Sequence, residues 1–542
     1  MKSSLLPILQ QAFPTESVVS YETKTKIVQA NAEGHLVTVL FDSGDDNDNG
    51  DNNNNNNNSG RCDNTAIKNN KSCFVKTVDA NYYYEKKGKN SWPDFRRTIM
   101  YLRTEVRFYQ EILPDLLSAL PLSSSSSSLS SNVNIFSTPE IYASNYNLDG
   151  LLTEEERATD DPMQGPVDVD WNTATTTSTN VITTAADDAT AVTAANSSKG
   201  GYIVMETIPE LQYIQDSPIT IQQAKDALDG IAAFHASAWE NQELLIKAQT
   251  RLSRGSYHLK TRNPKEVTGL VDAWIQFTTA FDINIDDNNN DNVDDNDNDN
   301  DNDNDNNNVD VDVDDDDDDD DDDKTNNDLG RRIQDLAEYI CAETSPEPTD
   351  KYATLSHGDC KAMNFFLPIS NDENKDNNRG VILIDFASTG VGLGMSDVAM
   401  LIHHAIRPEH LDDGGEMMLV DHYINKLNDL LLLKQQQQNQ EEETHDVNDA
   451  TMNTTTRPIK QSLCYYPKEI ALWHYKLAVA DYFRFFLGRF WKSATPESFE
   501  KKKYSKNTAF INRDRDAAFA FIKRVEKYVT EIEEVKQNKD NF

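Results

Sequence analysis

One short segment of this chain places a carboxylate, an amide and a second carboxylate at a spacing that suits phosphate chemistry. The run Leu355–Asn364 reads LSHGDCKAMN, so Asp359 and Asn364 lie five positions apart. About twenty residues later, the apolar run Val381–Ile384 leads directly into Asp385. Phosphoryl transfer needs a carboxylate that orients the attacking hydroxyl and takes its proton, and an amide and a second carboxylate that hold Mg²⁺. We assign Asp359 to the first role and Asn364 and Asp385 to the second, because Mg²⁺ prefers oxygen ligands.

The surroundings of these residues matter, because Asp and Asn are abundant in this chain. A His-Gly pair begins the first motif at His357, and an apolar Phe-Phe-Leu run follows it. The second motif is a strand-like run that ends in Asp385 and is followed by Phe386. Together the two motifs have the catalytic-loop and metal-loop pattern of kinases, whereas an Asp-x4-Asn spacing alone would indicate almost nothing. We also expect His357 to support the catalytic loop.

A lysine and a glutamate earlier in the chain offer the matching nucleotide-binding parts. Lys76 lies inside the apolar strand-like run Cys73–Val78, where a charged side chain needs a partner. Glu105 lies in the middle of the next amphipathic stretch, Pro93–Leu117. A Lys on a strand that pairs with a Glu on the following helix positions the ATP phosphates in kinases. The alternative is that Lys76 points outward from an edge strand and that Glu105 is a solvated helix residue.

The run Tyr202–Glu206 reads as the strand that enters the segment between two lobes. We expect backbone groups at Met205 and Glu206 to bind the adenine edge of a nucleotide. A strand that only packs in the core could have the same sequence. This run therefore indicates where the strand between the lobes would lie, but it does not by itself indicate nucleotide binding.

The remaining pattern has strand-like stretches in its first half and helix-like stretches in its second. The predicted strands are Val18–Tyr21, Leu36–Phe41, Ser72–Val78, Ile135–Tyr142, Tyr202–Met205 and Val381–Ile384; the predicted helices are Pro93–Leu117, Ile221–Trp239, Asp397–Ile406, Lys468–Trp491 and Ala517–Glu533. We therefore predict an α+β, two-lobed, protein-kinase-like fold. A small β-rich N-lobe and a larger helical C-lobe would form the site in the cleft between them.

Five low-complexity segments interrupt this pattern. We predict that they are disordered insertions, because they cannot bury enough apolar surface to offset the entropy of ordering. They lie near residues 42–60, 123–131, 153–198, 286–328 and 435–456. The predicted N-lobe covers residues 1–205 with the first three insertions, and the predicted C-lobe covers residues 206–542 with the last two.

Charge and composition argue against several classes of protein. The net charge is −41, but 27 Asp residues lie within Asp42–Gly60 and Asp286–Asp323, so the remainder is only mildly acidic. Such a chain lacks the basic footprint of a nucleic-acid binder. No apolar run approaches the ~18 residues of a membrane span. The five cysteines are scattered and form no C-x-x-C pair, which fits a reducing compartment, so we predict a cytoplasmic protein.

These motifs resemble the ecdysteroid-kinase-like family, also called CHK kinase-like, of the aminoglycoside and choline phosphotransferase superfamily. The resemblance rests on His357–Asn364 and Ile384–Phe386, and it extends over nearly the whole chain outside the insertions. Other matching stretches are Glu105–Tyr109, Leu228–Trp239, Gly394–Asp397, Trp473–Tyr475 and Asp481–Phe485.

The resemblance implies an ATP-dependent kinase that moves the γ-phosphate to a hydroxyl of a small molecule such as a sterol or an amino alcohol. The roles that it implies are Asp359 as the catalytic base, Asn364 and Asp385 as Mg²⁺ ligands, and Lys76 with Glu105 as an ion pair. It also implies that Asp397 braces the catalytic loop through hydrogen bonds, while His235 packs in the core. Besides ATP, Mg²⁺ and a small-molecule acceptor, we expect no nucleic-acid partner and a monomer.

Two departures from the kinase pattern leave a weaker enzyme as an alternative. No Gly-rich loop precedes Lys76, where only Gly34 lies near the expected turn. Ala387, rather than Gly, follows Phe386. A catalytically weak pseudokinase that acts as a binding or scaffold protein would fit these departures.

A protein kinase is the less favoured alternative. Gly358 stands where an Arg would read a phosphorylated activation loop. Only eleven residues separate Asp385 from Asp397, which leaves little room for a segment that docks a peptide.

Overall fold

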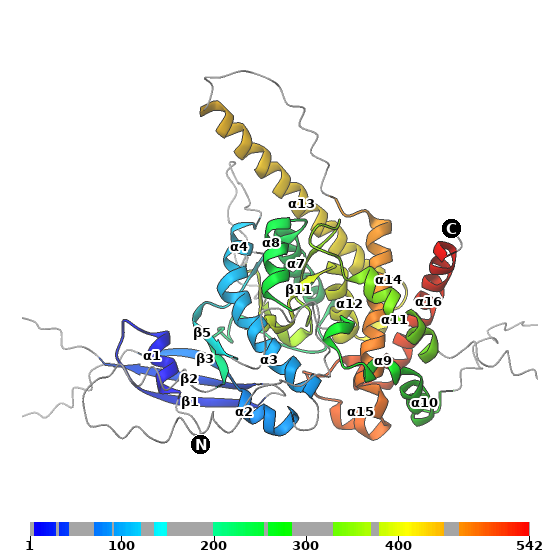
Figure 1. Ribbon diagram of the computed structural model, residues 1–542, viewed down its shortest axis with the longest axis horizontal. Helices are drawn as coiled ribbons and strands as arrows, with labels where there is room; N and C mark the ends of the chain where they lie inside the picture. The colour runs from blue at the N-terminus through cyan, green and yellow to red at the C-terminus, as the bar shows by residue number, and fades with distance from the viewer. Residues whose placement is uncertain are drawn as a thin grey trace, which may run out of the picture.

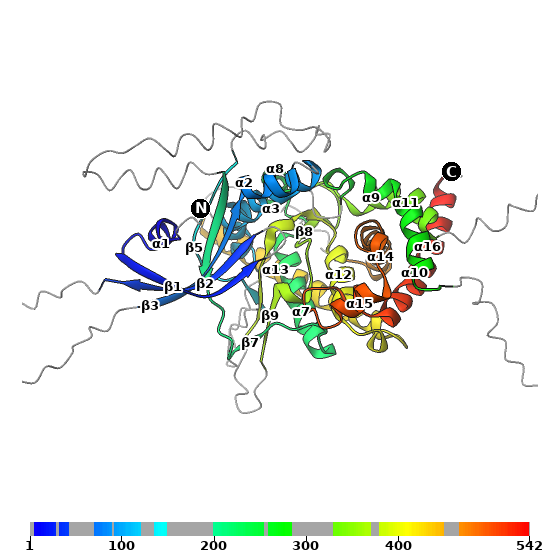
Figure 2. The ribbon, with the colours of Figure 1, turned by 90° about the horizontal axis from the view of Figure 1, so that it is seen from below.

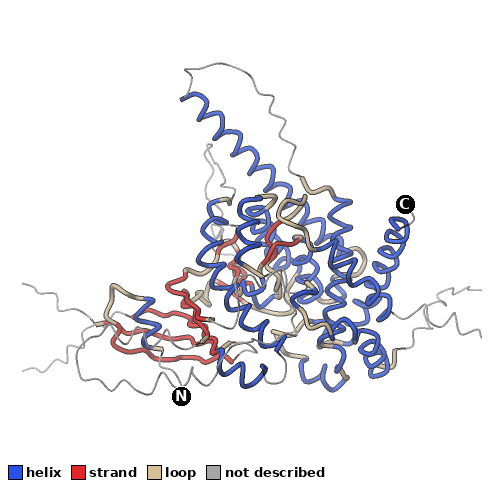
Figure 3. Tube along the Cα trace, in the orientation of Figure 1, coloured by secondary structure: helices blue, strands red, loops and turns tan. Residues whose placement is uncertain are grey.

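The computed structural model describes residues 5–28, 32–42, 70–88, 92–120, 135–148, 199–253, 258–283, 329–369, 379–448 and 465–540. These residues form a small antiparallel β-sheet and a larger body of helices (Figure 1). Figure 3 shows the sheet at one end of the molecule and the helices filling the other. The predicted α+β class, with a β-rich first part and a helical second part, is confirmed.

The N-terminal sheet has the strand order β1-β2-β3-β6-β5, and its neighbouring strands are antiparallel. Its strands are β1 (Val18–Val28), β2 (Glu33–Phe41), β3 (Asn70–Asp79), β5 (Ile141–Asn147) and β6 (Gly200–Glu206). Lys76 lies on the central strand β3, where it pairs with Gly34 of β2 and Ile203 of β6. The alternative that Lys76 lies on an edge strand is therefore wrong.

Side chains of β3 alternate between two faces that have different partners. Cys73 and Val75 pack with helix α1 (Leu6–Ala12) in a small hydrophobic cluster of their own. Phe74 and Val78 belong to the other face, which joins the main core beside helix α3 (Trp92–Arg107). The two-residue period therefore turns Lys76 toward α3 and away from α1.

The predicted helix Pro93–Leu117 is present, but its pitch changes along the way. A π-helical turn at Phe108–Ile112 follows α3 directly, and α4 (Leu113–Ser118) continues from it. Pro114 lies in the first turn of α4. Because proline has no N–H to donate to the preceding turn, a wider turn before it is expected.

The second part of the chain is mostly helical. Its helices are α7 (Ile221–Ala238), α8 (Gln242–Arg251), α9 (Lys265–Thr268), α10 (Leu270–Ala280), α11 (Leu329–Thr344), α12 (Gly394–Ala405), α13 (Gly415–Asn448), α14 (Lys468–Arg489), α15 (Pro496–Lys502) and α16 (Arg515–Asp540). A reciprocal pair of hydrogen bonds between Thr220 and Gln223 caps the start of α7, satisfying backbone groups that a helix end leaves open. Most of α7 is buried, so it forms the centre of this part.

Short strands between the sheet and the helices carry the loops that hold the motif residues. One sheet has the order β4-β10-β9-β7, and β8 pairs with β11 in a second. Their bounds are β4 (Phe136–Ser137), β7 (Tyr213–Ile214), β8 (Thr354–Ser356), β9 (Phe365–Pro368), β10 (Val381–Leu383) and β11 (Gly390–Gly392). Figure 2 shows β8 and β9 between the N-terminal sheet and helices α12 and α14.

Helix α13 corrects one predicted boundary. Residues 435–456 were expected to be a disordered insertion, yet α13 continues to Asn448 and projects from the helical body in Figure 1. Gln and Glu are good helix formers, so a Gln-rich composition does not by itself end a helix. The other predicted insertions lie outside the described residues, apart from Asp42, which follows β2.

One hydrophobic cluster runs from the inner face of the sheet into the helical part. The lobe boundary predicted at residue 205 lies within β6 and stays a prediction. Among the described residues, no helix has the length and apolar character needed to cross a membrane. Cys73, Cys341 and Cys360 are buried and unpaired.

Candidate active site

Lys76 is the centre of a charge network that joins the sheet to the helical part. Its Nζ lies 2.6 Å from Oε2 of Glu105 on α3 and 2.8 Å from Oδ1 of Asp385. Asp385 follows β10 and precedes the 3-10 turn Phe386–Ser388, with a left-handed φ of 65°. The Glu105 side chain is 2% exposed, whereas that of Asp385 is 23% exposed and can be reached by a ligand. The structure therefore brings together three residues that the sequence singled out.

Burial and the shared lysine set the charges in this network. Burial alone would lower the pKa of Lys76, but the Asp385 and Glu105 carboxylates outweigh it and raise that pKa above its ordinary value. Burial raises the pKa of Glu105 to about 7, against the effect of Lys76. Burial also disfavours the charge on Asp385, yet Lys76 and Lys361 hold its pKa below the ordinary value. Asp385 is therefore anionic at neutral pH, the state in which a carboxylate can bind Mg²⁺.

Asp359 is held by two residues of its own loop. Lys361 Nζ lies 2.6 Å from Asp359 Oδ2. The side-chain amide of Asn364 donates to the backbone oxygen of Asp359 at 2.8 Å and to its Oδ2 at 3.1 Å. Both of these contacts to the carboxylate use Oδ2, so Oδ1 is the oxygen better placed to meet a substrate. The Asp359 side chain is about a quarter exposed, which keeps it open to a substrate.

Lys361 is a site residue that the sequence reasoning missed. Burial alone would lower its pKa, but Asp359 and Asp385 raise it above the ordinary value. The lysine therefore stays cationic beside both aspartates. A Lys two positions after an Asp in a loop does not indicate where its side chain points. The one available signal was a charged residue among Cys360, Ala362 and Met363 inside the motif.

Asn364 and Asp385 are neighbours across the β9–β10 pair. Leu383 pairs with Phe365, and the backbone N–H of Ile384 donates to the backbone oxygen of Asn364 at 3.1 Å. The amide nitrogen of Asn364 is used by Asp359, which leaves its amide oxygen to face a cation. The donor set thus fits Mg²⁺, which binds proteins through one or two carboxylates and takes its other ligands from water and phosphate. No cluster of three or more His, Cys, Asp or Glu residues suited to a metal occurs in the described part of the chain.

Asp397 accepts hydrogen bonds from the start of the loop that carries Asp359. Its Oδ2 accepts from the His357 backbone N–H at 2.6 Å, and its Oδ1 accepts from the Gly358 N–H at 2.8 Å and from the Ser356 hydroxyl at 3.1 Å. The His235 ring lies 3.0 Å from Oδ2 and is fully buried. Asp397 is 1% exposed, so it touches the loop rather than solvent. His235 therefore packs in the core and also helps to orient this carboxylate.

The His357 ring joins the two motifs. Its Nδ1 accepts from the backbone N–H of Asp359 at 3.3 Å, so Nε2 carries the proton. Nε2 lies 3.0 Å from the backbone oxygen of Ile384, to which it donates. A single buried imidazole thus holds the loop of Asp359 next to the strand end that carries Asp385.

The strand expected to meet the adenine ring, β6, is paired on both sides. The Glu206 N–H donates to the backbone oxygen of Glu140 at 2.8 Å, and Met205 pairs with Phe74 and Ile141 inside the sheet. The backbone N–H of Glu206 is therefore already used within the sheet, and the binding of adenine at Met205 and Glu206 stays a prediction. Residues 29–31, which connect β1 and β2 before Gly34, lie outside the described residues.

A cavity of about 600 Å³ opens beside Asp359 and Lys361. Helices α3, α12, α14 and α15 and the loop of residues 507–512 contribute its walls. Its aromatic side chains are Tyr101, Tyr482, Phe485, Phe486 and Phe490. Asp481 and Arg484 do not line it; they form a buried ion pair of 2.7 Å with each other. Its volume and mixed lining are typical of a small-ligand site.

Comparison with known proteins bears on the region that carries these motifs. A search among curated proteins found no match. Residues 178–437 match the model of the ecdysteroid kinase-like family. The match includes Asp359, Asn364, Asp385 and Asp397, but it is narrower than the predicted resemblance and does not reach Lys76, Glu105 or α14. Over these residues, just under half of its length, the chain is similar to the ecdysteroid kinase-like family.

Proposed function

We propose that this protein is a small-molecule kinase that uses Mg²⁺ and ATP to phosphorylate a hydroxyl group. One observation carries the proposal. Asp359 lines the 600 Å³ cavity and is also bonded to Asn364, which adjoins Asp385 across the β9–β10 pair. A hydroxyl in the cavity would thus lie between a candidate base and a candidate metal site.

The residues of the network divide the work of phosphoryl transfer. Mg-ATP, when bound, supplies the phosphoryl group and neutralises part of its charge. Asn364 and Asp385 would hold the metal, and Lys76, oriented by Glu105, would hold the phosphates. Asp359 would orient the acceptor hydroxyl and accept its proton at Oδ1. Lys361 stays cationic beside Asp359 and would stabilise negative charge at the reacting oxygens.

The short connection between Asp385 and α12 favours a small acceptor over a peptide. After Asp385 the chain forms the turn Phe386–Ser388, then β11, and α12 begins at Gly394. β11 pairs with β8 and is largely buried, so this segment has no extended surface on which a peptide would lie. The cavity beside Asp359, with its aromatic wall, suits a compact molecule that carries an apolar body.

A screen of hydroxylated metabolites with γ-labelled ATP tests this function. Sterols, amino alcohols and sugars are compared with peptide arrays. We expect transfer to at least one small molecule and a fall in kcat of about 100-fold or more for Asp359→Ala, since a general base contributes roughly 10²–10⁴. Asp385→Asn is expected to abolish turnover and to weaken Mg-dependent ATP binding.

Folding of each variant is checked by circular dichroism, because both carboxylates are partly exposed and their loss leaves the core intact. Wild-type kcat in either variant would reject the proposed roles. ATP binding without any transfer would instead favour a pseudokinase. Sequence-selective peptide phosphorylation that depends on Asp359, with no small acceptor found, would favour a protein kinase.

A further inference from the structure

The cavity beside Asp359 has an excess of positive charge. Its lining includes six basic side chains and two acidic ones. The basic residues are Lys86, Arg97, Arg262, Lys361, Arg489 and Lys502, and the acidic ones are Asp94 and Asp359. The whole chain has a net charge of −41, so composition alone would give the opposite sign. Lys361 forms an ion pair with Asp359 at 2.6 Å, so the excess of positive charge comes from the other basic side chains.

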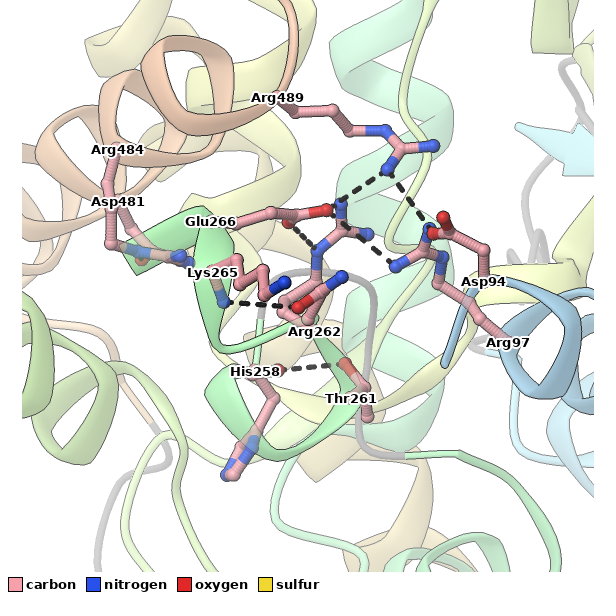
Figure 4. Close-up of polar contacts among 11 residues, drawn as sticks. Asp94, Arg97, His258, Thr261, Arg262, Lys265, Glu266, Asp481, Arg484 and Arg489 are labelled. Carbon is pink, nitrogen blue, oxygen red and sulfur yellow. Dashed lines mark hydrogen bonds and ion pairs between the residues drawn. The ribbon is translucent and has the colours of Figure 1, made fainter. Parts of the chain in front are cut away.

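Three of these cations form one cluster around Glu266. Figure 4 shows its carboxylate among guanidinium groups from three segments of the chain. The N–O distances from Glu266 are 2.7 Å to Arg262, 3.1 Å to Arg489 and 3.9 Å to Arg97. Asp94 adds the second carboxylate, 2.5 Å from Arg97 and 4.0 Å from Arg489. Among the residues that the structure describes, these three guanidinium groups thus share two carboxylates, which leaves an excess of one positive charge.

A buried donor in this cluster makes no hydrogen bond. Arg97 is 7% exposed, and its Nη1 has no hydrogen-bond partner among the described residues. Such a buried donor is costly unless another group meets it. Because Arg97 lines the cavity, a ligand that enters the cavity can provide the acceptor.

The position of Lys502 in the cavity lining is a second, independent observation. Lys502 is the last residue of α15, lines the same cavity and has no ion pair or side-chain hydrogen bond within the described part of the chain. Partial burial lowers its pKa, and no carboxylate offsets that effect. Lys501, the preceding residue on the same helix, is exposed and does not line the cavity.

Two simpler explanations account for only part of this pattern. The arginines could serve only to fasten α3 to α9 and α14, but fastening needs matched charges and does not explain Lys502. The cations could serve the phosphates of ATP, but Lys76 and Asp385 are not among the residues that line this cavity. The excess positive charge therefore lies in the cavity that we assign to the acceptor molecule, and not at the residues that we assign to the phosphates of ATP.

We propose that the acceptor is an amphipathic anion: a hydroxyl-bearing molecule with an apolar body and a carboxylate, sulfate or phosphate group. Arg97, Arg489 and Lys502 bind the anionic group, and the aromatic wall contacts the apolar body. Charge-assisted hydrogen bonds to guanidinium groups are stronger than neutral ones, so they fix the position of the molecule while its hydroxyl meets Asp359. This inference rests on the proposed function, because it names the substrate class of the same site.

Matched probes test the inference directly. On a hydroxysteroid and on a 12-carbon ω-hydroxyalkyl chain, a carboxylate, a sulfate and a phosphate are each compared with the neutral methyl ester of the carboxylate. Calorimetry measures binding to the full chain with Mg²⁺ and a non-hydrolysable ATP analogue, and a labelled-ATP assay measures transfer. We expect at least one anion to bind about tenfold more tightly than the ester, which corresponds to about 1.4 kcal/mol. The preferred head group identifies the anion.

Charge-neutralising variants locate the effect. Lys502→Gln is expected to lower the preference for the anion over the ester about tenfold, while Lys501→Gln keeps it and serves as the control for net charge. KM for ATP should be unchanged in Lys502→Gln, since the lysine serves the acceptor. Arg489→Gln, if it folds, should act in the same direction. A preference that Lys502→Gln does not reduce contradicts this site.

The outcomes separate this inference from the proposed function. Equal binding of ester and anions, or binding of no anion, overturns the inference, and transfer to a neutral alcohol would then leave the kinase function standing. Preferential anion binding that depends on Lys502, without transfer to any probe or library compound, supports the anion site and counts against the kinase function.

Discussion

Lys76 Nζ lies 2.8 Å from Asp385 Oδ1, although 309 positions separate the two residues in the chain. The same ammonium lies 2.6 Å from Glu105, so one cation holds two carboxylates from the two parts of the fold. Loss of the lysine would leave both carboxylates facing each other with little water. The ion pair therefore has a structural role that is separate from any part it takes in binding phosphate.

Lys76→Met is expected to lower the free energy of unfolding by about 3 kcal/mol, because a buried ion pair that loses one partner leaves an uncompensated charge. Glu105→Gln in the same background should recover part of this loss, since the buried Glu105 then no longer has to take up a proton or hold a charge beside Asp385. Urea denaturation of the two single variants and the double variant measures the coupling, expected between about 0.5 and 3 kcal/mol. The exposed pair Lys26–Glu33 provides the control, where Lys26→Met should change stability by less than about 1 kcal/mol. Strict additivity in the Lys76–Glu105 cycle would contradict this account.

Asp397→Asn should damage the catalytic loop although the side chain keeps its size. Both carboxylate oxygens accept from backbone N–H groups, at His357 and at Gly358. An amide offers only one oxygen, so either orientation turns an NH₂ group toward a backbone N–H. We expect a loss of about 1–3 kcal/mol of stability. We also expect kcat to fall more than KM for ATP changes.

Denaturation and steady-state kinetics check the Asp397 prediction. Asp421→Asn, which alters an exposed pair with Lys468, is the control and should change neither quantity much. An Asp397→Asn enzyme with normal stability and normal kcat would show that the loop does not depend on this carboxylate.

The motif residues could be predicted because they lie close together in the sequence, where spacing and neighbouring residues identify them. His357, Asp359 and Asn364 lie within eight positions, and Asp385 ends an apolar strand, so spacing alone indicates one loop and one strand end. Lys76 and Glu105 could be paired only because a strand and a helix follow each other in order. The structure places both beside Asp385, as the kinase pattern suggests.

The cavity wall was not predictable from the sequence. Arg97, Arg262, Arg489 and Lys502 come from four separate segments, and no spacing relates them. Their meeting depends on how α3 packs against the helical part, which is a tertiary property. The error at α13 has a different cause, because a low-complexity run of Gln favours a helix when it extends an existing one.

Two histidines, the buried His404 and the partly buried His474, are expected to make the protein sensitive to acid. Burial lowers the pKa of His474 to about 4 and that of His404 to about 3, from an ordinary value of 6.5. Because the folded state binds fewer protons than the unfolded state, their contribution is complete above pH 6.5 and is lost as pH falls toward 3–4. Each group can contribute a slope of about 1.4 kcal/mol per pH unit in this window.

His474→Gln tests the acid sensitivity away from the candidate site. Urea denaturation between pH 7 and pH 4.5 measures the unfolding free energy of both proteins. This free energy should fall less steeply with decreasing pH in the variant, and the difference in slope should correspond to the uptake of at most one proton on unfolding. At pH 7 the variant loses the 2.7 Å hydrogen bond between the His474 ring and the Tyr466 hydroxyl and should be the less stable protein. Identical pH slopes for the two proteins would argue against a neutral imidazole at His474 in the folded state.

Two glycines with left-handed backbones allow strain and collision to be separated. Gly358 has a φ of +76°, and a Cβ there would lie 2.3 Å from the backbone oxygen of Ser388. Gly414 has a φ of +86°, with no atom within 4 Å of the corresponding position. Alanine at Gly414 therefore meets only the left-handed backbone penalty, about 1–2 kcal/mol. Alanine at Gly358 meets that penalty and must also move the turn that follows Asp385.

We therefore expect Gly414→Ala to lose about 1–2 kcal/mol of unfolding free energy and to keep its kcat, because the residue lies before α13 and away from the cavity. Gly358→Ala should lose clearly more stability and also most of its kcat. Ser388 belongs to the turn that begins at Phe386, so any relief of the collision separates the loop of Asp359 from Asp385. The difference between the two variants measures the collision alone, since both share the left-handed strain. Equal losses of stability with retained kcat would mean that the loop of Asp359 can move away from the turn after Asp385 without loss of activity. The close approach at Gly358 would then have no catalytic importance.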